Sequence, residues 1–371
     1  MKKRMLITLA VLLNICPLFS QSASDNQAKR GNLYFSFRSI SFIRDDEYSN
    51  PIIEGYTLPG YFVQPELVYV PAERLQLRLG AHLLSYSGTD RFSLIKPVFS
   101  AKWYISPAAW FILGTLSGSD SHRMSDPHFN KERLYNAYSE DGAQFRFTDD
   151  YIFSDTWLSW ENFIFRGDTS REIFTAGESF RFFSPEIREH FWFEVPVQLQ
   201  FKHYGGQISN YPEEVETYFN TAAGIRINLD IGGGKFGAAA LEALLFNNLT
   251  LTKNAPSGIN KGYGQWYRFF YTYKVFFAEA GYWKGHNFYA PNGNFIFGSV
   301  SDHIDNLVIP DRNLVTCSAG VRYRPYRSLE LYLAFDGYYD TGLKRFDTAM
   351  AVHLRFNKLF RIAGNDFAES D

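Results

Sequence analysis

The sequence has almost no cysteine, no excess of charge of either sign, and no long apolar run beyond its N-terminus. Its 371 residues include two cysteines, 37 basic residues and 39 acidic residues, so the formal net charge is −2. A nucleic-acid-binding protein would normally carry a basic excess, which argues against that class and against nucleic acid as a partner. With 46% hydrophobic and 20% charged residues the chain is not intrinsically disordered. Without a second apolar run of about 20 residues it is not a helical membrane protein.

The N-terminus has the pattern of a secretory signal peptide. Basic residues at 2–4 precede an apolar run over 5–19, and the small residues Ser20 and Ser22 suit cleavage after Ser22. The run is shorter than the ~20 residues of a spanning helix, which argues against a membrane anchor. Ile15 stands before Cys16 where a lipoprotein signal needs a small residue, which argues against lipidation. We therefore predict a signal peptide over residues 1–22 and an exported mature chain over 23–371, in which Cys317 has no disulfide partner.

After residue 30 the dominant pattern is alternation of apolar and polar residues with period two. In the segment 345–356, Phe346, Met350, Val352, Leu354 and Phe356 fall on one face, and polar or small residues fall on the other. The segments 75–83, 190–202, 219–231 and 329–336 alternate in the same way. Such alternation indicates β-strands with one apolar face.

Two features favour a membrane barrel over a soluble β-sandwich, the alternative. The alternating segments are about ten to fourteen residues long, whereas globular strands have about five or six and tilted membrane strands about nine to eleven. Aromatic residues gather at their ends, as the girdles of a membrane barrel do. Examples are Trp103, Tyr104, Trp110, Tyr218, Tyr282, Tyr323 and Tyr339. We therefore predict an all-β, transmembrane, antiparallel β-barrel.

The turns allow the strands to be counted. Tight turns such as 71–73, 232–234 and 325–327 alternate with long segments such as 119–141 and 285–312, as expected for short periplasmic turns and long extracellular loops. The count is sixteen, or fourteen if one of the hairpins with blurred alternation (142–166 and 262–285) is lost. The predicted strands are 31–43, 60–70, 74–86, 91–104, 108–118, 142–150, 152–166, 172–183, 190–204, 218–231, 235–251, 262–273, 275–285, 313–325, 328–340 and 344–356.

A signal peptide, sixteen alternating strands and a last strand rich in aromatics together resemble Gram-negative outer-membrane β-barrel proteins. The architecture over residues 31–360 is most similar to that of the general porins, although no specific family motif is present. The resemblance implies a location in the outer membrane, contact with its lipid, and a possible homo-oligomer. Such barrels typically end on an aromatic residue, whereas Phe356 and Phe360 are followed by further residues here. We expect residues 361–371 to form a short periplasmic tail.

If the apolar face meets lipid, the polar face lines the lumen. Basic side chains on this face include Arg38, Arg78, Lys96, Lys102 and Arg355, and a similar number of acids balances them. In general porins the third extracellular loop folds inward and its acids face a basic wall. The resemblance implies the same for the loop 119–141, whose Asp120, Asp126 and Glu132 would lie opposite Arg38, Arg78, Lys96 and Lys102 and form a constriction with them. Arg355 on the last strand is expected to line the pore beside Arg38, where the barrel closes. The alternative to a constriction is an ordinary loop exposed to solvent.

Nothing in the sequence has the spacing of a catalytic or metal site. His, Asp and Glu residues do not form a metal motif, no cofactor motif is present, and Gly232–Gly234 lacks the context of a phosphate loop. The run Ser119-Asp120-Ser121-His122 offers the residue types of a hydrolase, but adjacency does not create the geometry of a triad. The sequence therefore predicts a protein that is not an enzyme.

The leading prediction is a porin-like channel through which small hydrophilic solutes diffuse. An alternative is a non-conducting barrel with a structural, assembly or secretion role, favoured by inward aromatics such as Trp192, Tyr332 and Tyr338. A third possibility is a barrel lipid hydrolase with catalytic residues on the outward surface near the rim.

Overall fold

The computed structural model describes residues 29–187, 190–206, 208–212, 214–252 and 258–364. The predicted signal peptide and most of the predicted tail lie outside these residues. Among them no helix is both long and apolar enough to cross a bilayer. The structure is built from sixteen strands. Their bounds are β1 Asn32–Glu47, β2 Thr57–Ala72, β3 Leu75–Tyr86, β4 Leu94–Tyr104, β5 Ala109–Thr115, β6 Asp141–Thr148, β7 Ile152–Asn162, β8 Glu172–Phe183, β9 Phe191–Gly205, β10 Glu216–Asp230, β11 Ala238–Thr250, β12 Lys261–Tyr273, β13 Phe276–His286, β14 Asp311–Tyr326, β15 Leu329–Asp340 and β16 Arg345–Gly364.

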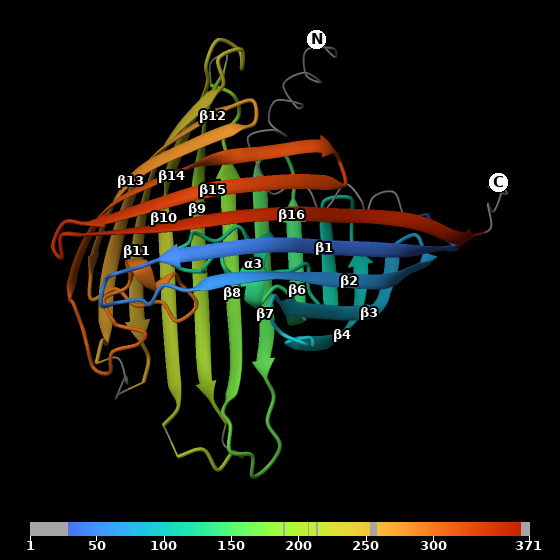
Figure 1. Cartoon of the computed structure of the whole chain (residues 1–371). Helices are drawn as coiled ribbons and strands as arrows, with labels where there is room; N and C mark the ends of the chain where they lie inside the picture. Colours follow the sequence, from blue (N-terminus) through green and yellow to red (C-terminus); the bar gives the residue numbers. More distant parts are fainter. Residues whose placement is uncertain (1–28, 188–189, 207, 213, 253–257, 365–371) are drawn as a thin grey trace.

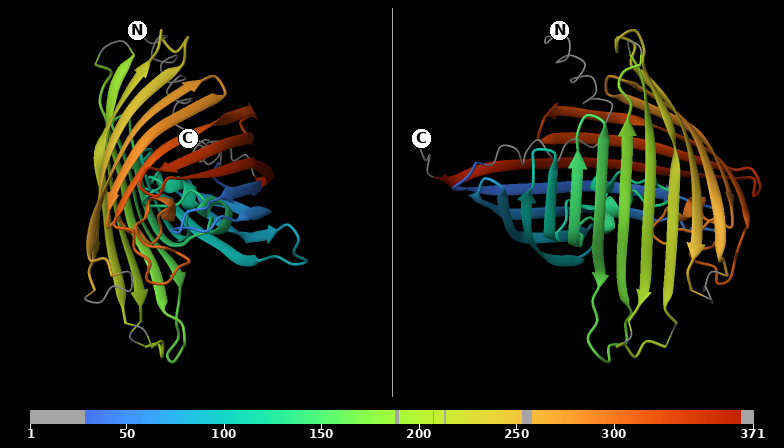
Figure 2. Two further views of the ribbon diagram at one scale, coloured as in Figure 1. Left: turned by 60° about the vertical axis from the view of Figure 1, so that its left-hand side comes forward. Right: turned by 180° about the vertical axis from the view of Figure 1, so that it is seen from behind.

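The strands form one closed barrel in which each strand pairs with its neighbours in the sequence and β1 pairs with β16 (Figures 1 and 2). All pairings are antiparallel, so the predicted fold class and the count of sixteen are confirmed. The last strand is longer than predicted, because β16 continues to Gly364, and Asn357 to Gly364 pair with β1. At this seam Arg38 lies opposite Asn357, while Arg355 lies opposite Ile40.

The outside of the barrel is apolar and the inside is polar. On β3 the side chain of Leu79 is exposed on the outer face, whereas Gln76 and His82 are buried inside. The same division holds on β16, where Met350 and Leu354 are exposed and Asp347 and His353 are buried. A closed barrel with an apolar outer surface and a polar interior is typical of outer-membrane barrels.

Ion pairs stiffen the inner wall on the side away from the barrel seam. Basic and acidic side chains alternate from strand to strand: Arg181 on β8, Glu194 on β9, Arg226 on β10, Glu242 on β11, Arg268 on β12 and Glu279 on β13. Each contacts the next within 4 Å, for example Arg181 and Glu194 at 3.0 Å and Arg268 and Glu279 at 3.2 Å. This belt neutralises six charges that would otherwise line the lumen.

Two long loops enter the barrel from the same end. The inward loop (residues 116–140, between β5 and β6) carries the 3-10 helix Ser119–His122 and the short helix α3, Arg133–Asn136. The β13–β14 loop (residues 287–310) packs Phe288, Ile296 and Phe297 against inward-facing apolar side chains of the wall, such as Trp266 and Trp283. Alternation blurs over 262–285 for this reason: the inner face of β12 and β13 is itself apolar where the loop covers it.

Candidate functional site

The inward loop is anchored deep in the barrel by a histidine held between two carboxylates. The Nδ1 of His122 lies 2.8 Å from an Asp155 oxygen, and its Nε2 lies 2.8 Å from a Glu140 oxygen. The ring stacks on Trp157 at a centroid distance of 3.8 Å and is fully buried. Arg146 also contacts Asp155, at 3.1 Å. His122 therefore ties the inward loop to the wall strand β7.

The charge state of His122 excludes it as a general base at neutral pH. Burial disfavours the imidazolium, but the carboxylates of Glu140 and Asp155 outweigh it and raise the pKa of His122 to about 9. Both ring nitrogens then donate hydrogen bonds, and neither has a lone pair available for catalysis. The Ser119–His122 run is thus a structural anchor and does not form a hydrolase triad.

The anchor is expected to weaken at high pH. Because the folded pKa lies above the value of about 6.5 for a free imidazole, charged His122 stabilises the protein fully below about pH 6.5, and this contribution is lost as the pH rises through about 9. The free energy of unfolding in urea, compared between the wild type and His122→Gln from pH 6.5 to 10, should differ most at the acidic end. A difference that does not change with pH would contradict this role.

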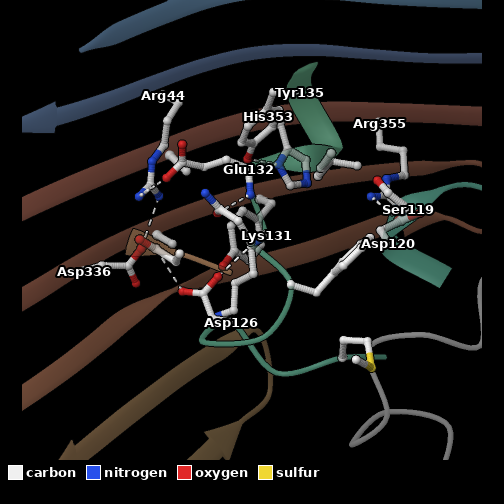
Figure 3. A pocket seen from close by; sticks show the side chains of 18 of the residues that line it. Arg44, Ser119, Asp120, Asp126, Lys131, Glu132, Tyr135, Asp336, His353 and Arg355 are labelled. Carbon is white, nitrogen blue, oxygen red and sulfur yellow. Dashed lines mark hydrogen bonds and ion pairs between the residues drawn. The ribbon is translucent and has the colours of Figure 1, made fainter. Parts of the chain in front are cut away.

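Beside the anchor, the inward loop, the β13–β14 loop and strands β1, β14, β15 and β16 enclose a cavity of about 280 Å³ (Figure 3). Its lining combines apolar surface with many charged side chains. From the loop come Asp120, Asp126, Lys131 and Glu132, and from the strands come Arg44, Arg322, Glu330, Asp336 and Arg355. A cavity with both apolar surface and charged side chains suits an amphipathic ligand with a polar or charged part.

Along one edge of the cavity, a hydroxyl, an imidazole and a carboxylate lie next to one another in that spatial order. The Tyr135 hydroxyl on α3 lies 3.0 Å from Nδ1 of His353, and Nε2 of His353 lies 3.8 Å from a Glu330 oxygen. The His353 ring stacks on Tyr332 with centroids 4.7 Å apart, which fixes its plane. The nearby carboxylate favours a proton on Nε2, so Nδ1 accepts the hydrogen bond that the Tyr135 hydroxyl donates. This is the order of groups that activates a hydroxyl oxygen, with Glu330 at ion-pair distance from Nε2 but beyond hydrogen-bond distance.

Burial raises the pKa of Tyr135 above its ordinary value. Its hydroxyl therefore keeps its proton at neutral pH and becomes nucleophilic only if a base takes that proton. His353 is the base within reach.

Positive charge gathers around the carboxylate end of this arrangement. Glu330 contacts Arg322 at 3.9 Å and also pairs with Arg324. Arg355 lies two residues along β16 from His353 and pairs with Asp120 at 2.9 Å. Three guanidinium groups thus surround Glu330 and His353, with one carboxylate from the strands and one from the inward loop to balance them.

At the opposite end of the cavity Arg44 is saturated by carboxylates. It contacts Asp46 at 2.6 Å, Asp336 at 3.2 Å and Glu132 at 3.4 Å. Burial raises the pKa of Glu132, although Arg44 opposes this effect. A group so fully paired is a structural bridge between the inward loop and the wall.

The structure brings together only some of the residues that were predicted to form a constriction. Asp120 pairs with Arg355, which was predicted to line the pore but was not among the four basic residues expected opposite the loop. The other predicted residues have separate partners. Among the basic ones, Arg38 donates to the Tyr138 hydroxyl at 2.9 Å, Arg78 contacts Glu66 at 3.8 Å, Lys96 contacts Asp141 at 2.7 Å and Lys102 lies over the Trp110 ring at 4.3 Å. Among the acidic ones, Asp126 accepts from Asn294 at 3.1 Å and Glu132 pairs with Arg44. Whether they line a pore stays a prediction.

Three residues of the site were not predicted from the sequence. Arg44 lies beyond residue 43, where the first strand was predicted to end, so its inward position was not recognised. Tyr135 is in a loop, where no periodicity marks a side chain. His353 was placed on the polar face of the last strand, but its partners come from β15 and the inward loop, and only the fold brings them together.

Other histidines lack the full arrangement. On the outer face His203 contacts the Thr217 hydroxyl at 2.9 Å near the loop end of β9 and β10. Within the described residues no carboxylate lies at ion-pair distance from His203. Nor does any group of three or more His, Cys, Asp and Glu side chains in the described ranges have the geometry to hold a metal ion.

Comparison with known families gives one match that covers nearly the whole chain. Residues 25–365 match a family model described as "Lipid A 3'-O-deacylase-type". A deacylase is an enzyme, so the prediction of a protein that is not an enzyme is wrong. The sequence analysis missed this because no short motif marks the site. No curated protein shows significant similarity to the chain.

Solved structures with a similar fold are outer-membrane porins. An anion-selective porin from Comamonas acidovorans has 9% sequence identity and a TM-score of 0.52, and the match covers 88% of this chain and 100% of the porin. OccK8 (OprE) of Pseudomonas aeruginosa has 11% identity and a TM-score of 0.51, with 88% and 98% covered. A loop-deletion mutant of OmpT from Vibrio cholerae has 11% identity and a TM-score of 0.51, with 89% and 100% covered. At such identities the likeness establishes a porin-like barrel and nothing finer.

Proposed function

This chain belongs to the lipid A 3'-O-deacylase-type family, and we infer that it is an outer-membrane hydrolase that releases an ester-linked acyl chain from a lipid A-type glycolipid. The observation that carries this inference is the Tyr135–His353–Glu330 arrangement at the edge of the charged cavity. A nucleophile and a base within hydrogen-bond reach, with the base oriented by a third group, are what acyl transfer requires.

Each of the three groups has a defined role. His353 takes the proton of the Tyr135 hydroxyl as the phenolic oxygen attacks the acyl carbonyl. Glu330 stabilises the imidazolium that forms. The imidazolium then returns the proton to the sugar oxygen that leaves, and water, deprotonated by the same imidazole, releases the fatty acid from Tyr135.

Although acids and bases balance over the cavity as a whole, the arginines beside His353 suit an anionic group of the substrate. Arg322 and Arg355 line the cavity beside His353, and each has one carboxylate partner, Glu330 at 3.9 Å and Asp120 at 2.9 Å respectively. A guanidinium can hold a phosphate with parallel hydrogen bonds. Since lipid A carries phosphate groups on its sugars, these two arginines would fix the headgroup while the ester reaches Tyr135.

The test is a mass-spectrometric assay with refolded protein in vesicles that contain lipid A. Hydrolysis predicts a lipid A product that has lost one ester-linked acyl chain, together with the free fatty acid. Vesicles of phospholipid alone serve as the matched substrate control. Intact lipid A after incubation with correctly folded protein would overturn the proposal.

A second candidate function is the diffusion channel for small hydrophilic solutes. The polar inner wall and the porin-like barrel favour it. The inward loop and the β13–β14 loop occupy much of the lumen, so any conductance should be small. Steady stepwise currents in a planar bilayer would support a channel, whereas a silent folded barrel would contradict it. The homo-oligomer implied by the porin resemblance stays a prediction.

A further inference from the structure

The barrel wall is incomplete next to the hairpin that carries the inward loop. Strands β5 and β6 have seven and eight residues, whereas the other strands have eleven to twenty. Pairing of β4 with β5 begins only at Ser100, opposite Gly114. Pairing of β6 with β7 ends at Gly142, opposite Ser159. Figure 2 shows the short β5 and β6 beside the tall β7 and β8.

The hairpin leaves the wall because its chain bends inward at a glycine. Gly114 has a φ of +104°, and a Cβ at this position would lie 2.2 Å from the carbonyl oxygen of Phe99. Beyond the bend the two arms stay paired inside the barrel, since Leu116 donates to Glu140 at 2.8 Å and Ser119 donates to Tyr138 at 3.1 Å. The residues that would extend β5 and β6 to the full height of the wall therefore form the inward loop instead.

What remains is a notch bounded by residues 94–99 of β4 and residues 160–162 of β7. We name it the wall notch. Pro97 lies on its β4 edge and has no N–H to offer to another strand, which disfavours closure by strand addition. The outer rim is apolar: Ile95 is 67% exposed, Phe99 58% and Phe163 63%. This rim is continuous with the lipid-facing surface of the barrel.

The inner side of the wall notch is polar. Lys96 faces inward and contacts Asp141 at 2.7 Å and the carbonyl of Ser139 at 3.0 Å. On the other edge Glu161 faces inward and pairs with Lys202 at 2.6 Å. An apolar outside and a charged inside match a lipid whose acyl chain lies in the bilayer and whose polar part points into the barrel.

The inward loop connects the wall notch to the cavity. From Gly114 the chain runs directly to Ser119 and Asp120, which line the cavity. Buried aromatic side chains of the inward loop and wall pack together between the two, so a lipid that passes from the notch to the cavity must displace them. Tyr138 stacks on Phe62 at 4.7 Å, and Phe42 lies 4.7 Å from Tyr135, the residue that contacts His353.

We propose that the wall notch is the lateral entrance through which an outer-leaflet lipid passes from the bilayer into the barrel. The inference rests on the proposed hydrolase function, whose substrate is a lipid and whose reactive groups are inside the barrel. It places the loops on the extracellular side, in accord with the short turns at the other end of the barrel. The lipid that would occupy the wall notch is the glycolipid substrate. Its ester would enter the barrel first, while its acyl chains would still lie in the notch.

Photo-crosslinking tests this entrance without relying on hydrolysis. A benzophenone amino acid is placed at Lys96 in the full chain with His353→Gln, refolded in vesicles of phospholipid and lipid A. Phe99, which faces lipid on the same strand, is the positive control, and Gln198, which is buried and faces inward on β9 away from the notch, is the negative control. Glu161 is a second notch position in case the first variant does not fold.

We expect lipid A adducts at Lys96 and Glu161 comparable with those at Phe99, and none at Gln198. If the probe at Phe99 forms lipid A adducts while the probes at Lys96 and Glu161 form crosslinks only to protein, the proposal of a lateral entrance is overturned. Adducts of equal strength at Gln198 would also overturn it, because lipid would then reach the lumen everywhere. Hydrolysis by the wild-type protein is measured separately, so a closed notch and an inactive cavity give different results.

Discussion

Replacement of His353 by glutamine is expected to lower the rate of acyl release from lipid A by about 10²- to 10⁴-fold, the usual contribution of a general base. Glutamine is close to histidine in length and can still bond to Tyr135, so the packing of α3 against β16 is kept while the proton acceptor is lost. Tyr135→Phe should cause a loss of similar size, because it removes the oxygen that the base activates and keeps the ring. The measurement is kcat for fatty-acid release, with KM changed little.

The matched control is His203→Gln. His203 also contacts a hydroxyl, that of Thr217 at 2.9 Å, but it does so on the outer face of the barrel. Lipid hydrolysis on the outward surface near the rim was one of the possibilities left open by the sequence, and His203 is a histidine placed there. Full activity in His203→Gln and loss in His353→Gln supports the cavity. The reverse result would move catalysis to the outer face and refute the role of Tyr135, His353 and Glu330.

The barrel could be predicted because the pattern that defines each of its strands lies within a short stretch of sequence. Each strand that faces lipid on one side and a polar lumen on the other must alternate, and the alternation, the aromatic ends and the tight turns were enough to define sixteen strands. Prediction was poorest where a loop packs inside. Trp266 and Trp283 face inward and are buried under Phe297, so β12 and β13 carry apolar side chains on the inner face beside the charged Arg268 and Glu279, and their alternation blurs.

The site was not predictable for a related reason. His353, Glu330 and Tyr135 come from two strands and a loop, and their meeting depends on how far the inward loop descends. The porin resemblance implied an inward loop whose acids face basic residues of the wall, but neither the pairing of Asp120 with Arg355 nor that of Glu132 with Arg44 was predicted. The run Ser119–His122 had the right residue types for a hydrolase, yet the fold uses His122 as a charged anchor.

Arg312→Met is expected to lower the free energy of unfolding by about 3–5 kcal/mol, the cost of removing one partner from a buried ion pair. Arg312 is fully buried and contacts Asp340 at 2.8 Å. It also donates to the carbonyls of Gly298 at 2.6 Å and Ile296 at 3.1 Å, at the end of the 3-10 helix Phe295–Phe297. Methionine fills the space but leaves one carboxylate and two carbonyls buried without this donor.

Urea unfolding, followed by tryptophan fluorescence, measures the change, because Trp266 and Trp283 pack against Phe297 beside these carbonyls. Lys284→Met is the control: Lys284 is exposed on the neighbouring strand at the same end of the barrel, and its loss should change stability by no more than about 0.5 kcal/mol. The double variant Arg312→Met, Asp340→Leu should be more stable than Arg312→Met alone, because it removes the stranded carboxylate.

The same substitution should also disturb the cavity at a distance. The β13–β14 loop supports the inward loop through Asn292, whose carbonyl accepts from Asn130 at 2.7 Å, and through Asn294, which donates to Asp126 at 3.1 Å. If Arg312 holds the β13–β14 loop, its loss should reduce acyl release by a smaller factor than His353→Gln does, and the double variant should recover part of it. Unchanged stability with lost activity would mean that Arg312 acts on the cavity by another route and would refute its role as the support of both loops.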